Sequence, residues 1–212
     1  MTKAERFEIS RALFHELTAF DTYHAKGSII CGTDEAGRGP LAGPVTAAAV
    51  VLPKNCELIG LNDSKKLSAK QRQVLYEQIM SIAIVGVATI SPAEIDEINI
   101  LQASLKAMQL AVAKLNEVTD IDIVLIDGTT LFSAPVGLST ILVPQGDSKS
   151  ACIAAASIVA KVTRDSFMEQ AALIYPEYGF EKHKGYGTAA HYAAIKEYGI
   201  CPIHRRTFLR SL

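Results

Sequence analysis

Four acidic residues stand where the sequence predicts strands or helices to begin or end. Asp34 and Glu35 end one apolar run, Asp127 ends another, and Asp147 comes just before a helix-like segment. A single aspartate at such a place is most often a helix cap or a turn residue. Four acids at strand and helix ends favour one shared site instead, and we predict that they converge.

Neighbouring residues of a regular strand point to opposite faces of a sheet. Asp34 and Glu35 can therefore serve one site only if the backbone leaves regular strand geometry. Gly32 and Gly37 flank the pair, and glycine permits such a change. We expect the backbone to twist at this point.

Converging carboxylates repel one another, which raises their pKa values unless cations lie among them. Carboxylates and water are the ligands that magnesium and manganese prefer. A pair of such ions roughly 4 Å apart activates an attacking water and neutralises a leaving oxygen. The four acids therefore predict metal-dependent hydrolysis of a phosphodiester bond.

The glycine-rich stretch GTDEAGRGPLAGPV at 32–45 raises the alternative of a nucleotide cofactor. Its glycines at 37, 39 and 43 miss the last interval of the dinucleotide fingerprint by one residue. A β-branched segment follows where a dinucleotide-binding fold would begin a helix. Asp34 and Glu35 would also repel a pyrophosphate. The dehydrogenase interpretation fails on these features.

The composition indicates one compact domain in a reducing compartment. The chain has 212 residues, of which 49% are hydrophobic, so it can bury a proper core. No apolar run approaches the length of a membrane span, and the first residues do not resemble a signal peptide. The four cysteines are far apart and form no CxxC pair, so we expect buried, reduced thiols and a cytoplasmic location.

Charge is distributed unevenly along the chain. The net charge of −1 argues against strong binding to nucleic acid. Residues 181–212 nevertheless hold six Lys or Arg against two Glu, a local charge of +4. This segment could bind phosphates, or it could be the solvated face of a helix; the charge alone leaves both open.

Periodicity and caps predict the elements that must position these residues. Strands are predicted at 29–34, 45–52, 84–90, 121–127 and 139–143, and helices at 4–20, after Ser68, after Ser91, at 151–173 and at 188–198. The helix after Ser91 is expected to continue along an apolar stripe to Leu115. This order predicts an α/β fold with a mixed sheet flanked by helices.

Eight motifs resemble the ribonuclease HII family, the type 2 ribonucleases H of bacteria. They are DEAGRGPLAGPV at 34–45, NDSKKLS at 62–68, SPAEID at 91–96, IDG at 126–128, GDSKS at 146–150, AAASIVAKVTRD at 154–165, HKGYGT at 183–188 and PIHRRTF at 202–208. The match runs in order from about residue 28 to the last residues. We therefore expect a catalytic domain at 28–212 and an N-terminal helical extension at 1–27.

The resemblance implies a fold and an activity. The fold is the ribonuclease H fold with extra C-terminal helices. The activity is Mn²⁺- or Mg²⁺-dependent cutting of RNA in RNA–DNA hybrids and 5′ of single ribonucleotides in duplex DNA, which leaves 3′-hydroxyl and 5′-phosphate ends. Ribonucleotide excision repair and RNA primer removal are the implied roles, and we expect a monomer that binds no membrane.

The resemblance also assigns residues. Asp34, Glu35, Asp127 and Asp147 match the catalytic, metal-binding carboxylates. The motif Gly37-Arg38-Gly39 matches the segment that recognises the ribose 2′-hydroxyl, and Tyr186 matches the tyrosine that senses an RNA–DNA junction. Glycines suit such a role because they let the backbone approach a sugar closely.

Further basic residues are weaker candidates for phosphate contacts. They are Lys65, Lys149 and Lys184, together with Arg205 and Arg206 of the C-terminal segment. Arg38 could bind a phosphate, or it could form a surface ion pair. Asp165 is expected to form an ion pair within its helix, and His183 and His204 are expected to be structural.

Other functions must also be considered. A resolvase or a ribonuclease HIII would share an acidic site, but the latter family carries an N-terminal substrate-binding domain for which 27 residues leave no room. From a different class, the chain could be a non-catalytic module that binds RNA–DNA hybrids. The presence of all four acids argues against that alternative.

Overall fold

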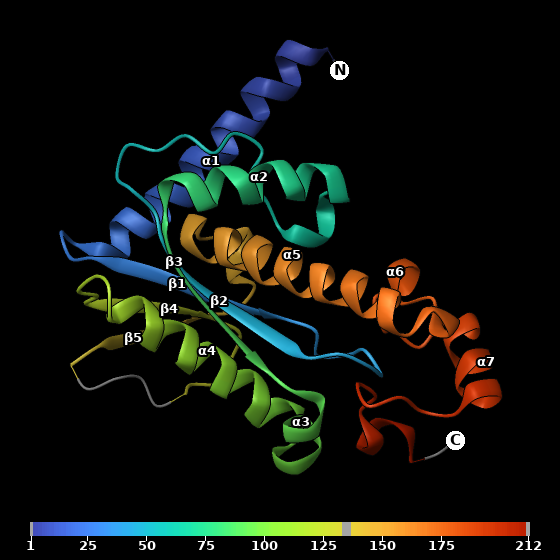
Figure 1. The fold of residues 1–212 in the computed structure, drawn as a ribbon. Helices are drawn as coiled ribbons and strands as arrows, with labels where there is room; N and C mark the ends of the chain where they lie inside the picture. Colours follow the sequence, from blue (N-terminus) through green and yellow to red (C-terminus); the bar gives the residue numbers. More distant parts are fainter. Residues whose placement is uncertain (1, 133–136, 211–212) are drawn as a thin grey trace.

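A five-stranded mixed sheet forms the centre of the computed structural model, which describes residues 2–132 and 137–210 (Figure 1). The strands are β1 (Ile30–Ala36), β2 (Val45–Val51), β3 (Ile84–Ile90), β4 (Ile123–Asp127) and β5 (Ser139–Val143), in the spatial order β3-β2-β1-β4-β5. The first three pair as antiparallel neighbours, whereas β4 pairs in parallel with β1 and with β5. The predicted mixed sheet is confirmed.

Helices cover both faces of the sheet. They are α1 (Lys3–Ala25), α2 (Ala69–Ile82), α3 (Pro92–Ile98), α4 (Ile100–Asn116), α5 (Ala151–Ile174), α6 (Phe180–His183) and α7 (Ala189–Tyr198), with 3-10 turns η1 (Ser64–Lys66), η2 (Gly146–Ser148), η3 (Pro176–Tyr178) and η4 (Arg206–Leu209). Figure 1 shows α1, α2 and α5 on one side of the sheet and α3 and α4 on the other. No helix in the described part of the chain has the length and apolarity to span a membrane.

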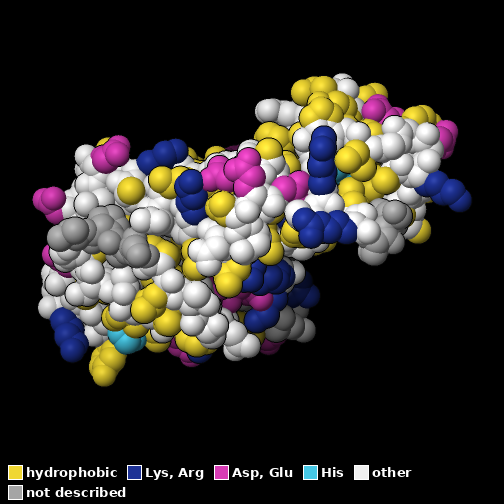
Figure 2. Space-filling model, turned by 90° about the horizontal axis from the view of Figure 1, so that it is seen from below, with side chains coloured by type: hydrophobic (Ala, Val, Ile, Leu, Met, Phe, Trp, Pro, Cys, Tyr) yellow, Lys and Arg dark blue, Asp and Glu magenta, His cyan; other side chains and the backbone are white. Residues whose placement is uncertain are grey.

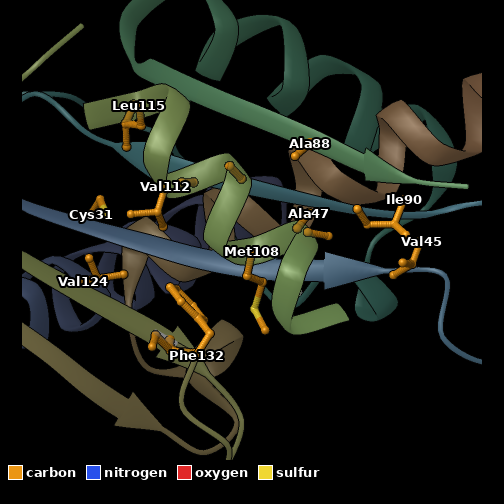
Figure 3. Packing of buried hydrophobic residues seen from close by; sticks show 14 of the residues in the cluster. Cys31, Val45, Ala47, Ala88, Ile90, Met108, Val112, Leu115, Val124 and Phe132 are labelled. Atoms are coloured by element: carbon orange, nitrogen blue, oxygen red, sulfur yellow. The ribbon is translucent and has the colours of Figure 1, made fainter. Parts of the chain in front are cut away.

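Helix α4 packs its apolar stripe on one face of the sheet. In Figure 3, Met108, Val112 and Leu115 point from this helix toward the strands, where Cys31 and Val124 meet them. All five side chains are buried. This layer holds β1 and β4 rigidly side by side, so their ends can position reactive groups.

Helix α5 lies on the opposite face and approaches β1 very closely. Its first half buries a run of small residues, including Ala154, Ala155 and Ala156. A side chain at Gly32 of β1 would collide with the backbone of Cys152 and Ile153. The predicted close contact between this small-residue helix and the sheet is confirmed.

The prediction of one continuous helix from Ser91 to Leu115 is wrong. The backbone of Asn99 has φ +67°, which ends α3, and its side chain accepts hydrogen bonds from the N–H groups of Leu101 and Gln102. Asparagine tolerates positive φ and caps helices well, so it divides the segment into two helices. The apolar stripe alone did not reveal this break.

The N-terminal helix is longer than predicted, and its second half is part of the core. Phe14 and Leu17 are buried against α5 and its neighbours. The carboxylate of Asp21 accepts a hydrogen bond of 2.9 Å from the N–H of Cys152, at the beginning of α5. Helix α1 therefore helps to fix the start of α5.

The end of α5 and the residues after it form a smaller cluster beyond the end of the sheet. Met168, Phe180 and Ala194 pack there around Ala42, which belongs to the glycine-rich loop. Seen from below, this C-terminal part is the lobe at the right of Figure 2, and Lys or Arg side chains are interspersed with Asp and Glu over the visible surface.

All four cysteines are free, as predicted, although Cys56 is only half-buried.

Candidate active site

The parallel strands β1 and β4 bring three of the predicted acids to one end of the sheet. Thr33 pairs with Ile126, so Asp34 and Asp127, the next residues of the two strands, lie at the same level. Glu35 follows Asp34 in the ladder and pairs with Ala47 of β2. The convergence of these strand ends is as predicted.

The expected twist at Asp34 and Glu35 is wrong. Strand β1 keeps its register with β2 as far as Ala36, and the backbone departs only at Gly37, where φ is +103°. Asp34 and Glu35 nevertheless interact electrostatically with each other and with Asp127. They can do so because β4 ends at Asp127, which leaves the sheet open at this level.

A short hydrogen bond brings the fourth acid to the site. The N–H of Gly146 donates to Oδ1 of Asp127 over 2.6 Å. Gln145 adopts left-handed backbone geometry before it, and the 3-10 turn η2 then presents Asp147. Asp127 thus fixes the loop that carries Asp147, and repulsion between the two acids helps to raise the pKa of Asp147.

Burial and repulsion from neighbouring carboxylates disfavour the charged forms of Asp34, Glu35 and Asp147. The pKa of Asp34 is raised well above its ordinary value by burial, and also by the charges of Glu35 and Asp127. Burial raises the pKa of Glu35 too, although the nearby Arg38 opposes this shift. For Asp147, burial and the neighbouring Asp63 raise the pKa. The site therefore concentrates negative charge that a cation would stabilise.

Lys65 lies among these acids. Its ammonium is 3.5 Å from Oδ2 of Asp147, and its side chain is 81% exposed. Partial burial opposes its charge, but Asp147, Asp63 and Asp34 outweigh that effect and raise its pKa. Asp63 escaped the sequence analysis although it belongs to the motif at 62–68. Asp63 caps η1, which contains two lysines, and this position is the feature that could have identified it as part of the site.

The donor atoms of this site fit a hard divalent cation. All four predicted acids supply carboxylate oxygens, the ligands that Mg²⁺ and Mn²⁺ prefer. Within residues 2–132 and 137–210, no three His, Cys, Asp or Glu side chains form a ready-made group that could hold a metal ion. The chemistry of the donors and the accumulated charge, rather than a closed cage, indicate the metal.

The glycines of the motif at 37–39 differ in their surroundings. A Cβ atom added at Gly37 would collide with the buried side chain of Arg164 and with the carbonyl oxygen of Pro44. One added at Gly39 would meet only the ring of Tyr186, at 3.6 Å. Gly37 is thus required by packing, whereas a small side chain at Gly39 would only touch the ring of Tyr186.

This difference predicts unequal effects on stability. Gly37→Ala should cost at least about 1–3 kcal/mol, because it overpacks the core and strains a positive φ. Gly39→Ala should lower the melting temperature by no more than about 2–4 °C, the shift that roughly 1 kcal/mol produces in a chain of this size. Thermal melts of both variants measure the effects. Equal losses would contradict the distinction.

Tyr186 lies on the surface rather than in the core. Its side chain is 45% exposed, and Nζ of Lys161 is 6.0 Å from the centre of its ring. The N–H of the same residue donates to the carbonyl of His183, and its own carbonyl is 3.0 Å from Nδ1 of His191. The turn is therefore held by its backbone, which leaves the ring available to a ligand.

Several predicted basic contacts are already engaged within the chain. Nζ of Lys149 donates to the carbonyl of Pro144, and Nζ of Lys184 pairs with Glu169 at 2.7 Å. Arg38 is 53% exposed and lies 3.4 Å from Glu35. Lys65 and Arg38 are thus the predicted cations that combine proximity to the acids with exposure.

The prediction that Arg205 faces phosphates is wrong, because its side chain is completely buried. Its guanidinium donates to carbonyl groups of the glycine-rich loop. Asp165 pairs with Lys161 one helical turn away, as the expected ion pair within the helix. His204 is buried against Cys201 and His191, which agrees with a structural role.

Replacing one acid should stabilise the metal-free protein. The folded pKa of Asp34 is raised, so its unfavourable contribution is absent below the unfolded pKa and grows as pH rises toward the folded value. Asp34→Asn removes this penalty, and its oxygen can still accept the N–H of Glu35. In a chelator, we expect a higher melting temperature than wild type at pH 8 and a smaller gain at pH 5. A lower midpoint at pH 8 would contradict the repulsion.

Comparisons with known proteins agree with the fold and show the family. The family model described as Ribonuclease HII matches residues 31–211. A ribonuclease HII of Lachnoclostridium phytofermentans is 48% identical over 98% of this chain and 81% of its own length. The ribonuclease HII of Archaeoglobus fulgidus, solved in complex with PCNA, superposes with a TM-score of 0.71 at 27% identity, covering 87% of this chain and 95% of that one.

A more distant structure, Bst ribonuclease HIII solved in complex with Mn²⁺, has a TM-score of 0.68 at 18% identity. The alignment covers 90% of this chain and 66% of that one, and it shows likeness of fold alone.

Proposed function

This chain belongs to the ribonuclease HII family, and we propose that Asp34, Glu35, Asp127 and Asp147 are the acids with which it cuts RNA. It is an endoribonuclease that acts on RNA–DNA hybrids and on ribonucleotides embedded in DNA. The observation that carries the residue assignment is the meeting of two parallel strand ends and the η2 turn at one charged edge. The same activity suits ribonucleotide excision repair and RNA primer removal.

The four carboxylates would hold Mn²⁺ or Mg²⁺, which supplies an activated water and neutralises the leaving 3′ oxygen. Asp127 keeps the turn that carries Asp147 in place through the N–H of Gly146. Lys65 offsets negative charge beside Asp147 and is exposed enough to meet a phosphate. These residues therefore position the scissile phosphate against the acids.

The ribose would lie against Gly39 and Tyr186, which are close neighbours on the surface. The absence of a side chain at Gly39 lets a sugar approach the backbone, and the exposed ring of Tyr186 can pack against it. Only the 2′-hydroxyl distinguishes RNA from DNA at such a place, and backbone groups of residues 37–39 can bind it. Cutting would thus require both the acids and this ribose-binding site, which consists of residues 37–39 and Tyr186.

The decisive experiment is cleavage of a DNA duplex that contains one ribonucleotide. We expect cutting 5′ of the ribonucleotide in Mn²⁺ or Mg²⁺, with 3′-hydroxyl and 5′-phosphate ends, and no cutting of the all-DNA duplex. A chelator should abolish the reaction. Binding without cleavage in either metal would instead support the non-catalytic hybrid-binding module.

The location and assembly of the protein are further proposals. We expect a location in the cytoplasm, because the four cysteines are free and suit a reducing compartment. We also expect a monomer. Light scattering of the free protein and of its complex with the single-ribonucleotide duplex measures the assembly. A stable dimer in either state would contradict the monomer.

A further inference from the structure

Two buried arginines hold the glycine-rich loop. Arg164 of α5 is 1% exposed and Arg205, near the C-terminus, is 0% exposed. Arg205 donates from Nε to Gly43, from Nη1 to Arg38, and from Nη2 to both Gly37 and Pro44, in each case to the carbonyl oxygen. The shortest of these bonds is 2.6 Å, to Gly37.

Arg164 binds the same loop and shares the carbonyl of Pro44 with Arg205. Its Nε donates to the carbonyl of Pro44 over 3.0 Å, and its Nη2 donates to the carbonyls of Ala42 and Lys184. Lys184 immediately precedes the turn that carries Tyr186. Arg164 therefore links the glycine-rich loop to the tyrosine turn through one guanidinium group.

These arginines are not part of ordinary ion pairs. Nη1 of Arg164 is 3.9 Å from Asp165, and in the described part of the chain no carboxylate lies within 4 Å of Arg205. Burying a guanidinium is costly unless its donors are satisfied. Here carbonyl groups of the loop satisfy most of them, so each arginine and the loop conformation depend on one another.

The contacts of Arg205 also orient two peptide groups. In a trans peptide, the C=O and the following N–H point in opposite directions. The carbonyls of Gly37 and Arg38 point toward Arg205, so the N–H groups of Arg38 and Gly39 point away from it. Neither N–H has a partner among the described residues.

We propose that Arg205, assisted by Arg164, is a positioning residue that turns the N–H groups of Arg38 and Gly39 outward as donors to the ribose 2′-oxygen. This inference rests on the proposed function of the site. Arg205 contacts neither substrate nor metal; it acts through the backbone that it binds. One basic residue of the C-terminal segment thus serves recognition of RNA indirectly, from inside the protein.

The planar fork of the guanidinium is essential to this role. It reaches four carbonyl oxygens in fixed directions, whereas the ammonium of lysine is a point charge on a flexible chain. Arg205→Lys keeps the positive charge but should release at least one of the two peptide groups. A general structural role would weaken all activities equally, whereas a positioning role should affect the discrimination between RNA and DNA.

The test measures binding in Ca²⁺ to two duplexes that differ only in one 2′-hydroxyl. Wild type should bind the single-ribonucleotide duplex more tightly than the all-DNA duplex. Arg205→Lys should reduce this preference by about tenfold, the effect of roughly one hydrogen bond, while its affinity for all-DNA duplex stays within about twofold. The neighbouring, exposed Arg206 provides the matched control, and Arg206→Lys should leave the preference unchanged.

Two outcomes would overturn the inference. One is an unchanged preference in folded Arg205→Lys, and the other is an equal loss of affinity for both duplexes. If wild type itself shows no preference and no cleavage, the proposed function fails instead, so the two failures are distinguishable.

A measurement on wild type covers the case in which Arg205→Lys does not fold. Amide hydrogen exchange at Arg38 and Gly39 should be fast in the free protein and with all-DNA duplex in Ca²⁺. It should slow at least about tenfold with the single-ribonucleotide duplex, because the hydroxyl then accepts these donors. Slow exchange in the free protein, or equal protection by both duplexes, would contradict the inference.

Discussion

Asp127→Asn should fold normally and lose cleavage by more than about 100-fold. Mutation of groups that only support a metal ligand typically costs about 10–100-fold, and replacing a ligand itself should cost more. The amide is a poorer metal ligand, but its oxygen can still accept the N–H of Gly146, so the η2 turn should stay in place. Single-turnover cleavage of the single-ribonucleotide duplex in Mn²⁺ measures the loss.

The matched control is Asp165→Asn. Asp165 is also half-buried, but it pairs with Lys161 on α5 instead of joining the acids at the strand ends. Its replacement should change the cleavage rate by less than about threefold, because removing such a pair affects stability by about 0.3–0.5 kcal/mol. Wild-type turnover by folded Asp127→Asn would remove this residue from the site.

Tyr186→Ala should impair cutting at a single embedded ribonucleotide by at least about tenfold more than cutting of a continuous RNA strand paired with DNA. A stacking ring contributes roughly 1–3 kcal/mol per base in nucleic-acid complexes, and only the isolated ribonucleotide depends on sensing the junction. Since the ring is half exposed and its turn is held by backbone contacts, stability should change little. Cleavage rates on the two substrates and a thermal melt test these points.

Tyr23→Ala provides the comparison, because Tyr23 is an exposed tyrosine on α1, outside the proposed ribose-binding site. It should leave the ratio of the two rates unchanged. Equal losses on both substrates in Tyr186→Ala would make Tyr186 a general catalytic residue. A large fall in melting temperature would mean that the ring supports the fold.

Local sequence patterns determined many of the elements and suggested which acids form the site. Strands β1, β2 and β3 and the capped starts of α2 and α3 follow from apolar patterning and serine caps, which are properties of a few neighbouring residues. The motif around Asp34 and Glu35 also made the family recognisable. Such features are accessible because their physical causes lie within one segment.

The exact residue at which a helix or strand ends was harder to predict from the sequence. The apolar stripe of α3 and α4 hid the positive φ of Asn99, since the stripe continues across the break. The regular strand geometry that β1 keeps through Asp34 and Glu35 was also not predicted from the sequence, for a related reason. How two neighbouring side chains reach one site depends on where β4 ends, and β4 comes about 90 residues later.

Only the tertiary structure separated the roles of similar residues. Gly37 and Gly39 look equivalent in the sequence, yet a side chain would collide with Arg164 at the first and would only touch Tyr186 at the second. Arg205 and Arg206 are neighbours, yet one is buried in the glycine-rich loop and the other is exposed. Residue type and spacing determine what a side chain can do chemically, but its burial and partners come from segments far away in the chain. The sequence by itself therefore identified the family and suggested the acids, whereas long-range packing decided which glycine could take a side chain and which arginine supports the loop.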